Sequence, residues 1–252
     1  MDATQTLFES GGHRNLLLPD QSSGLAVQAN QHLIVDGDEA CLLDPGGHKV
    51  YSKVLAETLE QLGRASLTHI FFSHQDPDII AAANGWLMTT DARAYISSLW
   101  VRFVPHFGLD QLLEDRLEPI PDEGRYLKVG QTELVVLPAH FLHSCGNFQI
   151  YDPTAKILYS GDLGASLGQS YEVVEDFDAH LTYMEGFHRR YMTSKKALSG
   201  WADMAAGLDI EVIAPQHGAR FEGPAVARFI DWCRELECGV DLLPPPSLPP
   251  RG

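Results

Sequence analysis

The sequence is short of cysteine, of positive charge and of long apolar runs, and each shortage excludes a class of protein. Its four cysteines are scattered without zinc-finger spacing, which favours a reduced protein over a disulfide scaffold. Lysine and arginine number 18 against 34 acidic residues, a net charge of −16, and an acidic surface repels phosphate backbones. No apolar run approaches membrane-spanning length. We therefore expect no nucleic-acid partner and no membrane span.

The two ends of the chain carry little beyond a proline-rich tail. The N-terminal MDATQTLFESGGHRN has no basic stretch followed by an apolar core, so we expect no signal peptide and a cytoplasmic protein. The 252 residues are 44% apolar, which is enough for a sizeable core. We expect one domain over residues 1–240 and an extended or disordered tail over residues 241–252.

Apolar patterns and turn residues predict a mixed α/β chain. The expected strands cover residues 24–30, 31–38, 39–47, 66–73, 92–97, 133–138, 147–152, 156–160 and 210–215. The expected helices cover residues 51–63, 78–90, 194–208 and 225–237. Strands in hairpins mixed with helices indicate sheets covered by helices, which is an α/β sandwich.

Four of the expected strands lead directly to a histidine or an aspartate. The residues that follow them are His74, His143, Asp162 and His217. Loops at strand ends can converge while the strands fix their bases. We therefore expect these side chains to meet at one site.

The stretch SHQDPDII, residues 73–80, adds two carboxylates to His74 and has two readings. Asp76 and Asp78 stand on either side of Pro77. Asp followed by Pro is also an ordinary helix start, with Asp76 as the N-cap, Pro77 at the first position and Asp78 beside the helix dipole. Asp162 as a loop cap and His217 as a turn residue are equally ordinary. Metal binding rests on all the segments occurring together.

The candidate ligands are three histidines and three aspartates: His74, Asp76, Asp78, His143, Asp162 and His217. Six such side chains suit two metal ions, which in such sites lie about 3.5–4 Å apart with a shared oxygen ligand. A nitrogen and oxygen donor set without thiolate favours iron and leaves zinc open.

The order of these segments resembles the metallo-β-lactamase superfamily. Its usual pattern is H-x-H-x-D-H, then a distant His, a distant Asp and a final His. Residues 74–79 read HQDPDI, so that Asp76 replaces the second histidine and Ile79 replaces the third. The DPGG at residues 44–47 also looks like this superfamily. The similarity covers residues 25–235 and implies an αββα sandwich.

A carboxylate at the second position resembles the flavodiiron proteins, which reduce oxygen or nitric oxide. Their pattern has Glu at the place of Asp76, and the shorter residue looks more like the oxygen-binding di-iron sensors related to them. The resemblance implies two iron ions (Fe2+/Fe3+), one held by His74, Asp76 and His143, the other by Asp78 and His217, with Asp162 bridging. Ile79 would leave an open coordination position at the second iron.

The function implied by the resemblance is binding of dioxygen, as an oxygen sensor. No Gly-rich dinucleotide loop occurs, and no flavodoxin-like domain follows the last helix, so we expect no bound flavin. A separate flavoprotein or other redox donor, or a signalling partner, would then act with the chain, which is also compatible with a homo-oligomer. The alternatives are an oxygen or nitric oxide reductase with an external donor, a dinuclear zinc hydrolase, and a metal-free scaffold.

Further residues are weighed for a place near the metal ligands. The resemblance makes Tyr191 of FHRRYM a candidate to lie behind these ligands. The alternative is that Tyr191 is an ordinary packed tyrosine with its hydroxyl at the surface. His106 and His140 are either hydrogen-bond partners of the ligands or of bound oxygen, or structural or exposed histidines. Cys145, two residues after His143, is expected to be a small buried residue rather than an iron ligand.

Overall fold

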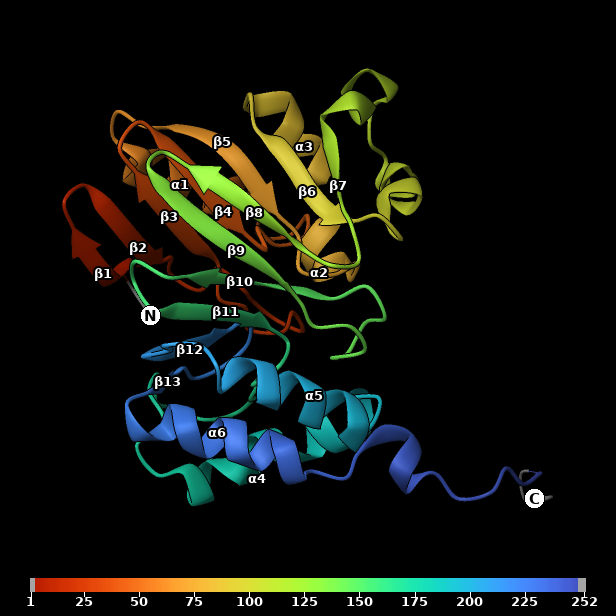
Figure 1. The fold of residues 1–252 in the computed structure, drawn as a ribbon. Helices are drawn as coiled ribbons and strands as arrows, with labels where there is room; N and C mark the ends of the chain where they lie inside the picture. The colour runs from red at the N-terminus through yellow and green to blue at the C-terminus, as the bar shows by residue number, and fades with distance from the viewer. Residues whose placement is uncertain (1–2, 249–252) are drawn as a thin grey trace.

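The structure is a computed structural model that describes residues 3–248. Two sheets pack face to face, and helices cover the outer face of each (Figure 1). The expected αββα sandwich is confirmed. The tail contains part of the 3-10 helix η3 (Gly239–Leu242), and the division into a domain over residues 1–240 and a tail stays a prediction.

The first sheet contains seven strands in sequence order, antiparallel from β1 to β4 and parallel from β4 to β7. Its strands are β1 (Gln5–Ser10), β2 (His13–Leu17), β3 (His32–Asp36), β4 (Glu39–Leu43), β5 (Ser66–Phe71), β6 (Arg93–Ser97) and β7 (Leu117–Ile120).

The second sheet contains six strands in the order β13-β12-β11-β10-β9-β8. All neighbours are antiparallel except β11 and β12. Its strands are β8 (Arg125–Val129), β9 (Thr132–Pro138), β10 (Phe148–Asp152), β11 (Ile157–Gly161), β12 (Val212–Pro215) and β13 (Phe221–Glu222).

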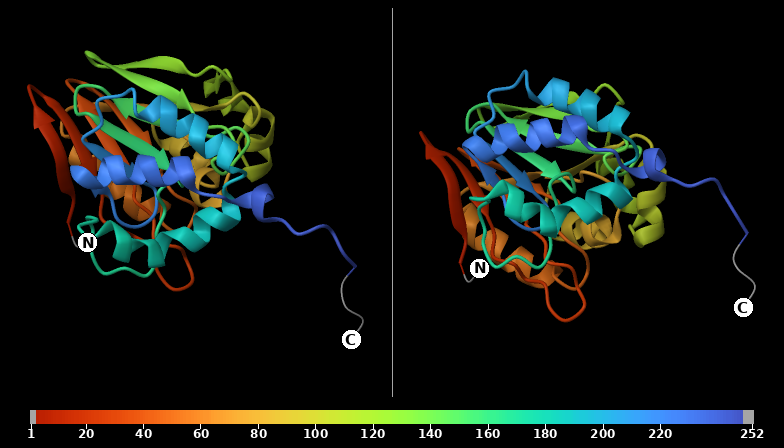
Figure 2. Two further views of the ribbon diagram at one scale, coloured as in Figure 1. Left: turned by 60° about the horizontal axis from the view of Figure 1, so that its bottom comes forward. Right: turned by 90° about the horizontal axis from the view of Figure 1, so that it is seen from below.

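Three α-helices pack on the outer face of each sheet. The first sheet carries α1 (Tyr51–Leu62), α2 (Pro77–Ile80) and α3 (Ala83–Thr89). The second carries α4 (Phe177–Tyr191), α5 (Lys195–Ala205) and α6 (Pro224–Glu235), which Figure 2 shows side by side. The 3-10 helices η1 (Val101–Phe107) and η2 (Gln111–Arg116) precede β7.

The central strands β3 and β4 are apolar on both faces because each face contacts a different core. On β3, Leu33 and Val35 pack toward the helices, while Ile34 packs toward the second sheet. Successive side chains of a strand point to opposite faces, so a strand buried on both faces reads as an unbroken apolar run. This pattern places β3 and β4 in the centre of the molecule.

Two expectations about single elements are wrong, and some elements were not expected at all. Residues 24–30 form an irregular segment rather than a strand, because Gln28 and Asn30 bind the turn after β12. Residues 78–90 form two short helices with a break at residues 81–82. The hairpin of β1 and β2 and the helix α4 were not expected. Among residues 3–248, none of the helices combines the length and apolar character needed to cross a bilayer.

Candidate metal centre

The six candidate ligands meet at one end of the two sheets. His74 lies three residues after β5, and Asp76 and Asp78 follow it at the start of α2. His143 lies in the loop between β9 and β10, and Asp162 and His217 come directly after β11 and β12. The expected convergence of these residues is therefore present in the structure.

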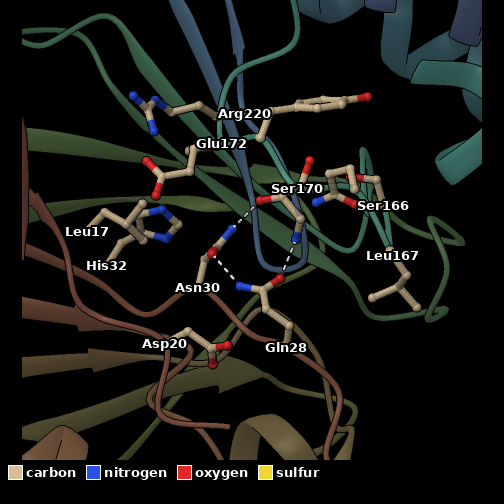
Figure 3. A pocket seen from close by; sticks show the side chains of 15 residues that line it. Leu17, Asp20, Gln28, Asn30, His32, Ser166, Leu167, Ser170, Glu172 and Arg220 are labelled. Carbon is tan, nitrogen blue, oxygen red and sulfur yellow. Dashed lines mark hydrogen bonds between the residues drawn. The ribbon is translucent and has the colours of Figure 1, made fainter. Parts of the chain in front are cut away.

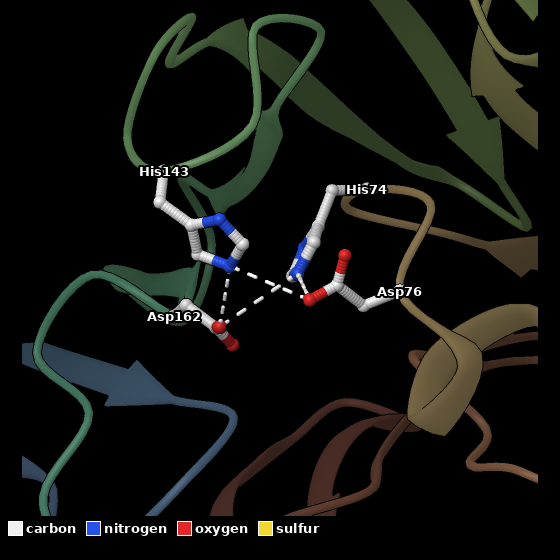
Figure 4. A group of neighbouring side chains, drawn as sticks. All are labelled: His74, Asp76, His143 and Asp162. Atoms are coloured by element: carbon white, nitrogen blue, oxygen red, sulfur yellow. Dashed lines mark hydrogen bonds and ion pairs between the residues drawn. The ribbon is translucent and has the colours of Figure 1, made fainter. Parts of the chain in front are cut away.

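Four of the residues present their ligand atoms within 4.8 Å of one another: His74, Asp76, His143 and Asp162. The Oδ2 atom of Asp162 lies 2.9 Å from Nε2 of His143 and 3.7 Å from Nε2 of His74. The Oδ2 atom of Asp76 lies 3.6 Å from each of the same two nitrogens. Figure 4 shows the four side chains pointing at one common space. Together these four side chains could hold a metal ion.

The remaining two residues face the other oxygen of the Asp162 carboxylate. Nε2 of His217 lies 3.4 Å from Oδ1 of Asp162 and 3.5 Å from Oδ2 of Asp78. Asp162 thus turns one oxygen toward His74 and His143, and the other toward His217. A carboxylate in this position is suited to bridge two metal ions.

The side chain of Asp76 does not cap α2, which was the alternative to metal binding. The backbone of Asp76 occupies the N-cap position of α2 with Pro77 following it, as expected. Within the described part of the chain, however, its side chain makes no capping hydrogen bond. Its carboxylate instead faces the two histidines, while the helix start is stabilised by the backbone carbonyl of Asp76, which accepts hydrogen bonds from Ile79 and Ile80.

Hydrogen bonds to Nδ1 orient two of the imidazoles. Nδ1 of His217 donates to the carbonyl of Gln28 at 2.5 Å, which leaves Nε2 as the free nitrogen facing the aspartates. Nδ1 of His74 lies 2.9 Å from Oγ of Ser73. Partners of this kind fix the ring orientation and the tautomer of metal-binding histidines.

The DPGG segment contacts the backbone of the stretch that carries His74, Asp76 and Asp78. Oδ1 of Asp44 accepts a hydrogen bond from the backbone N–H of Ser73 at 2.8 Å, just before His74. A Cβ atom on Gly47 would lie 2.9 Å from the carbonyl oxygen of Pro77. Glycine is therefore needed at Gly47 for the backbone to approach the start of α2 so closely.

The charges of the site balance one another without a metal. Burial works to lower the pKa of His217, but the Asp162 carboxylate raises it to about 9. Burial works to raise the pKa of Asp162, but the hydrogen bond from His143 and the nearby imidazole of His217 hold it well below its usual range. Burial also works against charge on His74, whose pKa is raised nonetheless by Asp76 and Asp162. The carboxylates of the site thus favour positive charge at His74 and His217.

Two buried polar atoms of the site make no hydrogen bond within the described part of the chain. Among residues 3–248, neither Nε2 of His74 nor Oδ1 of Asp162 has a hydrogen-bond partner. Proteins rarely leave buried polar atoms unpaired, and a bound ion can satisfy such atoms. Both atoms face the shared space of the ligands, and the donors are imidazole and carboxylate, so the residues fit a pair of iron or zinc ions.

A cavity of about 680 Å3 opens beside the ligands. Its walls come from the irregular segment before β3, the DPGG segment, the start of α2 and one face of α4, and they include Val27, Val50, Tyr183, Phe187 and Tyr191. These side chains make much of the cavity wall beside the ligands apolar.

The Tyr191 ring lies against the ligand His143, with ring centroids 5.7 Å apart, and stacks on Phe187. Tyr191 is therefore close to the site although 56% exposed. Ile79 is completely buried with the helix-facing core of the first sheet, and it is not among the described residues that line the cavity.

The other weighed residues lie elsewhere. His140 is hydrogen-bonded to the carbonyl of Asp122 at 2.8 Å and packs on Phe148. His106 is exposed on η1. Cys145 is exposed, so the expectation that it is buried is wrong.

Residues behind the ligands were missed by the sequence analysis. Gln28 and Asn30 bind the turn that carries His217 through hydrogen bonds with Gly218. Figure 3 shows Gln28 and Asn30 at the wall of a second cavity of about 220 Å3. Gln28 and His217 are 189 residues apart in sequence, and no periodic pattern connects them. Ser73 and Gln75 flank His74, and this adjacency was the one available signal.

Comparison with known proteins places this geometry in a family. Residues 27–218 match the family described as ODP family beta lactamase. Two structures of the chemotaxis sensor ODP, a peroxy di-iron species and the apo state from T. denticola, are each 40% identical, with a TM-score of 0.84 over 95% of this chain and 97% of theirs. No curated protein matches the sequence.

Flavodiiron proteins share the fold at lower identity. A variant of the protein from Thermotoga maritima is 17% identical with a TM-score of 0.76, and the protein from Giardia intestinalis is 16% identical with a TM-score of 0.75. They align with 92% and 91% of this chain, which spans 60% and 58% of theirs. The chain therefore belongs to the ODP family of β-lactamase-fold proteins, the di-iron branch of the metallo-β-lactamase superfamily that its sequence resembles.

Proposed function

We propose that the chain binds two iron ions and, at that centre, dioxygen. His74, Asp76 and His143 hold one ion, Asp78 and His217 hold the other, and Asp162 bridges them. The observation that carries the proposal is the orientation of the Asp162 carboxylate. Its two oxygens face two separate groups of donors. Iron, when bound, supplies the redox chemistry toward dioxygen.

The protein's own part is to fix the donors and to control water and protons. Gln28 holds the His217 ring so that Nε2 faces the centre. The largely apolar cavity limits the supply of water and protons to whatever is bound beside the ligands. Because Ile79 replaces a histidine of the superfamily pattern, the ion beside Asp78 and His217 has fewer side-chain ligands than the other. That ion is the one with a coordination position open to a small gas molecule.

Sensing is favoured over reduction. The chain is 40% identical to a chemotaxis sensor along almost the whole of both chains, whereas the flavodiiron proteins share the fold alone. We propose that a signalling protein, rather than a substrate, receives the outcome of oxygen binding. A cytoplasmic setting fits the four cysteines, which are all free.

Metal analysis followed by exposure to oxygen tests the iron centre. Protein expressed with balanced iron and zinc and purified without oxygen should contain about two iron ions per chain. Admission of air should change its visible absorption spectrum. Stoichiometric zinc, hydrolytic activity and no spectral response to oxygen would identify the hydrolase alternative instead.

The choice between sensing and reduction is tested by turnover. Iron-loaded protein mixed with a stoichiometric amount of oxygen should react once. The oxidised protein should then persist until a reductant is added. Addition of NADH to the isolated chain should give no sustained oxygen consumption. Rapid, continuous consumption of oxygen or nitric oxide with NADH and no added flavoprotein would establish a reductase.

A further inference from the structure

The residue between His74 and Asp76 contacts both sides of the metal centre. The amide nitrogen of Gln75 donates to Oδ1 of Asp76 at 3.1 Å, and its amide oxygen accepts from the hydroxyl of Ser144 at 2.6 Å. Asp76 follows a strand of the first sheet, while Ser144 belongs to the loop of the second sheet that carries His143. One half-buried side chain thus connects two ligand segments that are 69 residues apart.

The hydrogen-bond chemistry fixes which way the Gln75 amide points. An ionised carboxylate only accepts hydrogen bonds, so the NH2 group must face Asp76, and the amide oxygen is then left for the Ser144 hydroxyl. An aspartate carboxylate is ionised at neutral pH, so Asp76 offers only acceptor atoms to the amide. The amide therefore has one orientation that satisfies both neighbours.

The two oxygens of Asp76 are consequently not equivalent. Oδ1 is engaged by Gln75, whereas Oδ2 faces Nε2 of His74 and Nε2 of His143 at 3.6 Å each. Aspartate is one methylene shorter than the glutamate of the flavodiiron pattern and has less freedom to reach a metal by itself. A partner that fixes the carboxylate plane is correspondingly more important.

We propose that Gln75 is a positioning residue of the metal centre, which directs a single oxygen of Asp76 at the ion held by His74 and His143. The proposal rests on the proposed metal-binding function. It assigns Gln75 to one of the two ions, because its contacts lie on the side of Asp76 and Ser144 and away from Asp78 and His217. Loss of the amide should then affect the two ions unequally.

The test is an anaerobic titration of metal-free protein with Fe2+ in competition with a coloured chelator, which gives two stepwise dissociation constants. Gln75→Leu keeps the size of the side chain and removes both hydrogen bonds. We expect one dissociation constant to rise about 10–100-fold, as is common when a partner behind a metal ligand is lost, and the other to stay within about threefold. In the Mössbauer spectrum of iron-loaded protein, one of two iron signals should change.

A matched control and a second variant separate positioning from folding. Gln61 also donates its amide to a carboxylate, that of Glu57 at 2.9 Å on α1, so Gln61→Leu removes the same kind of bond far from the site and should leave both constants unchanged. Ser144→Ala keeps the bond from Gln75 to Asp76 and should weaken iron binding less than Gln75→Leu does. Metal-free Gln75→Leu and Gln61→Leu should melt at similar temperatures.

Unchanged constants in Gln75→Leu, or equal losses at both ions, would overturn the assignment. If Gln75→Leu folds poorly, a Ser144→Ala loss as large as 100-fold would also overturn it, because the donation to Asp76 is intact there. Failure of the proposed function looks different, since wild-type protein would then prefer zinc and ignore oxygen. The same titration with Zn2+ would still reveal whether Gln75 positions Asp76.

Discussion

Asp162 gives the strongest single-residue argument for two metal positions, because its two oxygens face two different groups of donors. We expect Asp162→Ala to lower occupancy of both metal positions, whereas His217→Ala should empty mainly one. The reason is that a bridging carboxylate contributes to both ions, while His217 faces Oδ1 of Asp162 and Asp78 alone. Metal content per chain, measured after dialysis at fixed free iron, checks the difference.

A control aspartate removes the ambiguity of a general loss of stability. Asp176 caps α4 by accepting a hydrogen bond from the N–H of Ala179, and its replacement by alanine should cost about 1 kcal/mol without changing metal content. Full occupancy of both positions in Asp162→Ala would show that Asp162 is the loop cap of the alternative reading.

The raised pKa of His217 predicts how the metal-free protein responds to pH. Its pKa in the folded protein is about 9, against an ordinary value of 6.5. A raised pKa stabilises the fold fully below pH 6.5, and this contribution is lost as the pH rises to about 9. Urea unfolding of metal-free protein should show up to about 3 kcal/mol less stability at the upper end of this range.

Two comparisons make the pH effect specific. In His217→Gln the decline between pH 6.5 and about 9 should largely disappear, and in metal-loaded protein it should be replaced by tighter metal binding as protons leave. A metal-free wild-type protein whose stability is flat over this range would contradict the charge balance inferred between His217 and Asp162.

The irregular segment between β2 and β3 makes hydrogen bonds with the turn that carries His217. Asn30 is buried, and its amide nitrogen donates to the carbonyls of Pro215 and Gly218 at 2.9 Å each. Asn30→Leu would leave buried carbonyls unpaired, at a cost of roughly 2 kcal/mol or more. It should also weaken the metal position of His217, which lies between these carbonyls.

Denaturant unfolding and iron titration of Asn30→Leu check the two effects separately. Gln149→Leu offers a comparison, because Gln149 is also a buried amide with two partners, the carbonyl of Ser160 and the indole of Trp201. It should lose stability without selective loss at one metal position. A variant of Asn30 that is destabilised but binds both irons normally would limit the segment to a structural role.

The elements also show how far sequence reasoning reaches. The strands that end at the ligands were predictable, because short apolar runs such as residues 70–72 and 212–215 stop at a polar residue. Residues 24–30 were misread as a strand because their apolar pattern is the same, while the partners that hold them in an irregular form lie about 190 residues away. Gln75 was likewise seen only as a spacer, since its partner Ser144 comes from the other sheet.

The helix α4 was missed for a related reason. Its exposed positions are rich in charge and its buried face contains His180 and His188 in place of a regular apolar stripe. His188 accepts a hydrogen bond from the N–H of Gly164 at 2.8 Å and donates to the carbonyl of Met184. Burial lowers the His188 pKa to about 4, so the ring is neutral and acts as a core residue, which its sequence context does not reveal.

In the whole molecule, the metal centre joins the two halves of the sandwich. His74, Asp76 and Asp78 follow a strand of the first sheet, and the other three ligands follow strands of the second. Separation of the two sheets would therefore destroy both metal positions at once. Because the unfolded chain lacks this donor set, bound metal should stabilise the complete fold rather than one loop.

The size of this stabilisation follows from mass action. At free iron 100 times above its dissociation constant, each site adds about 2.7 kcal/mol to the free energy of unfolding, so two sites add about 5 kcal/mol. For a chain of this length, each kcal/mol raises the melting temperature by about 2–4 °C, and we expect a rise of roughly 10–20 °C. Anaerobic calorimetry with and without iron measures it, and His217→Ala should show about half the rise. Two bound ions with an unchanged melting temperature would mean that the metal does not join the two sheets.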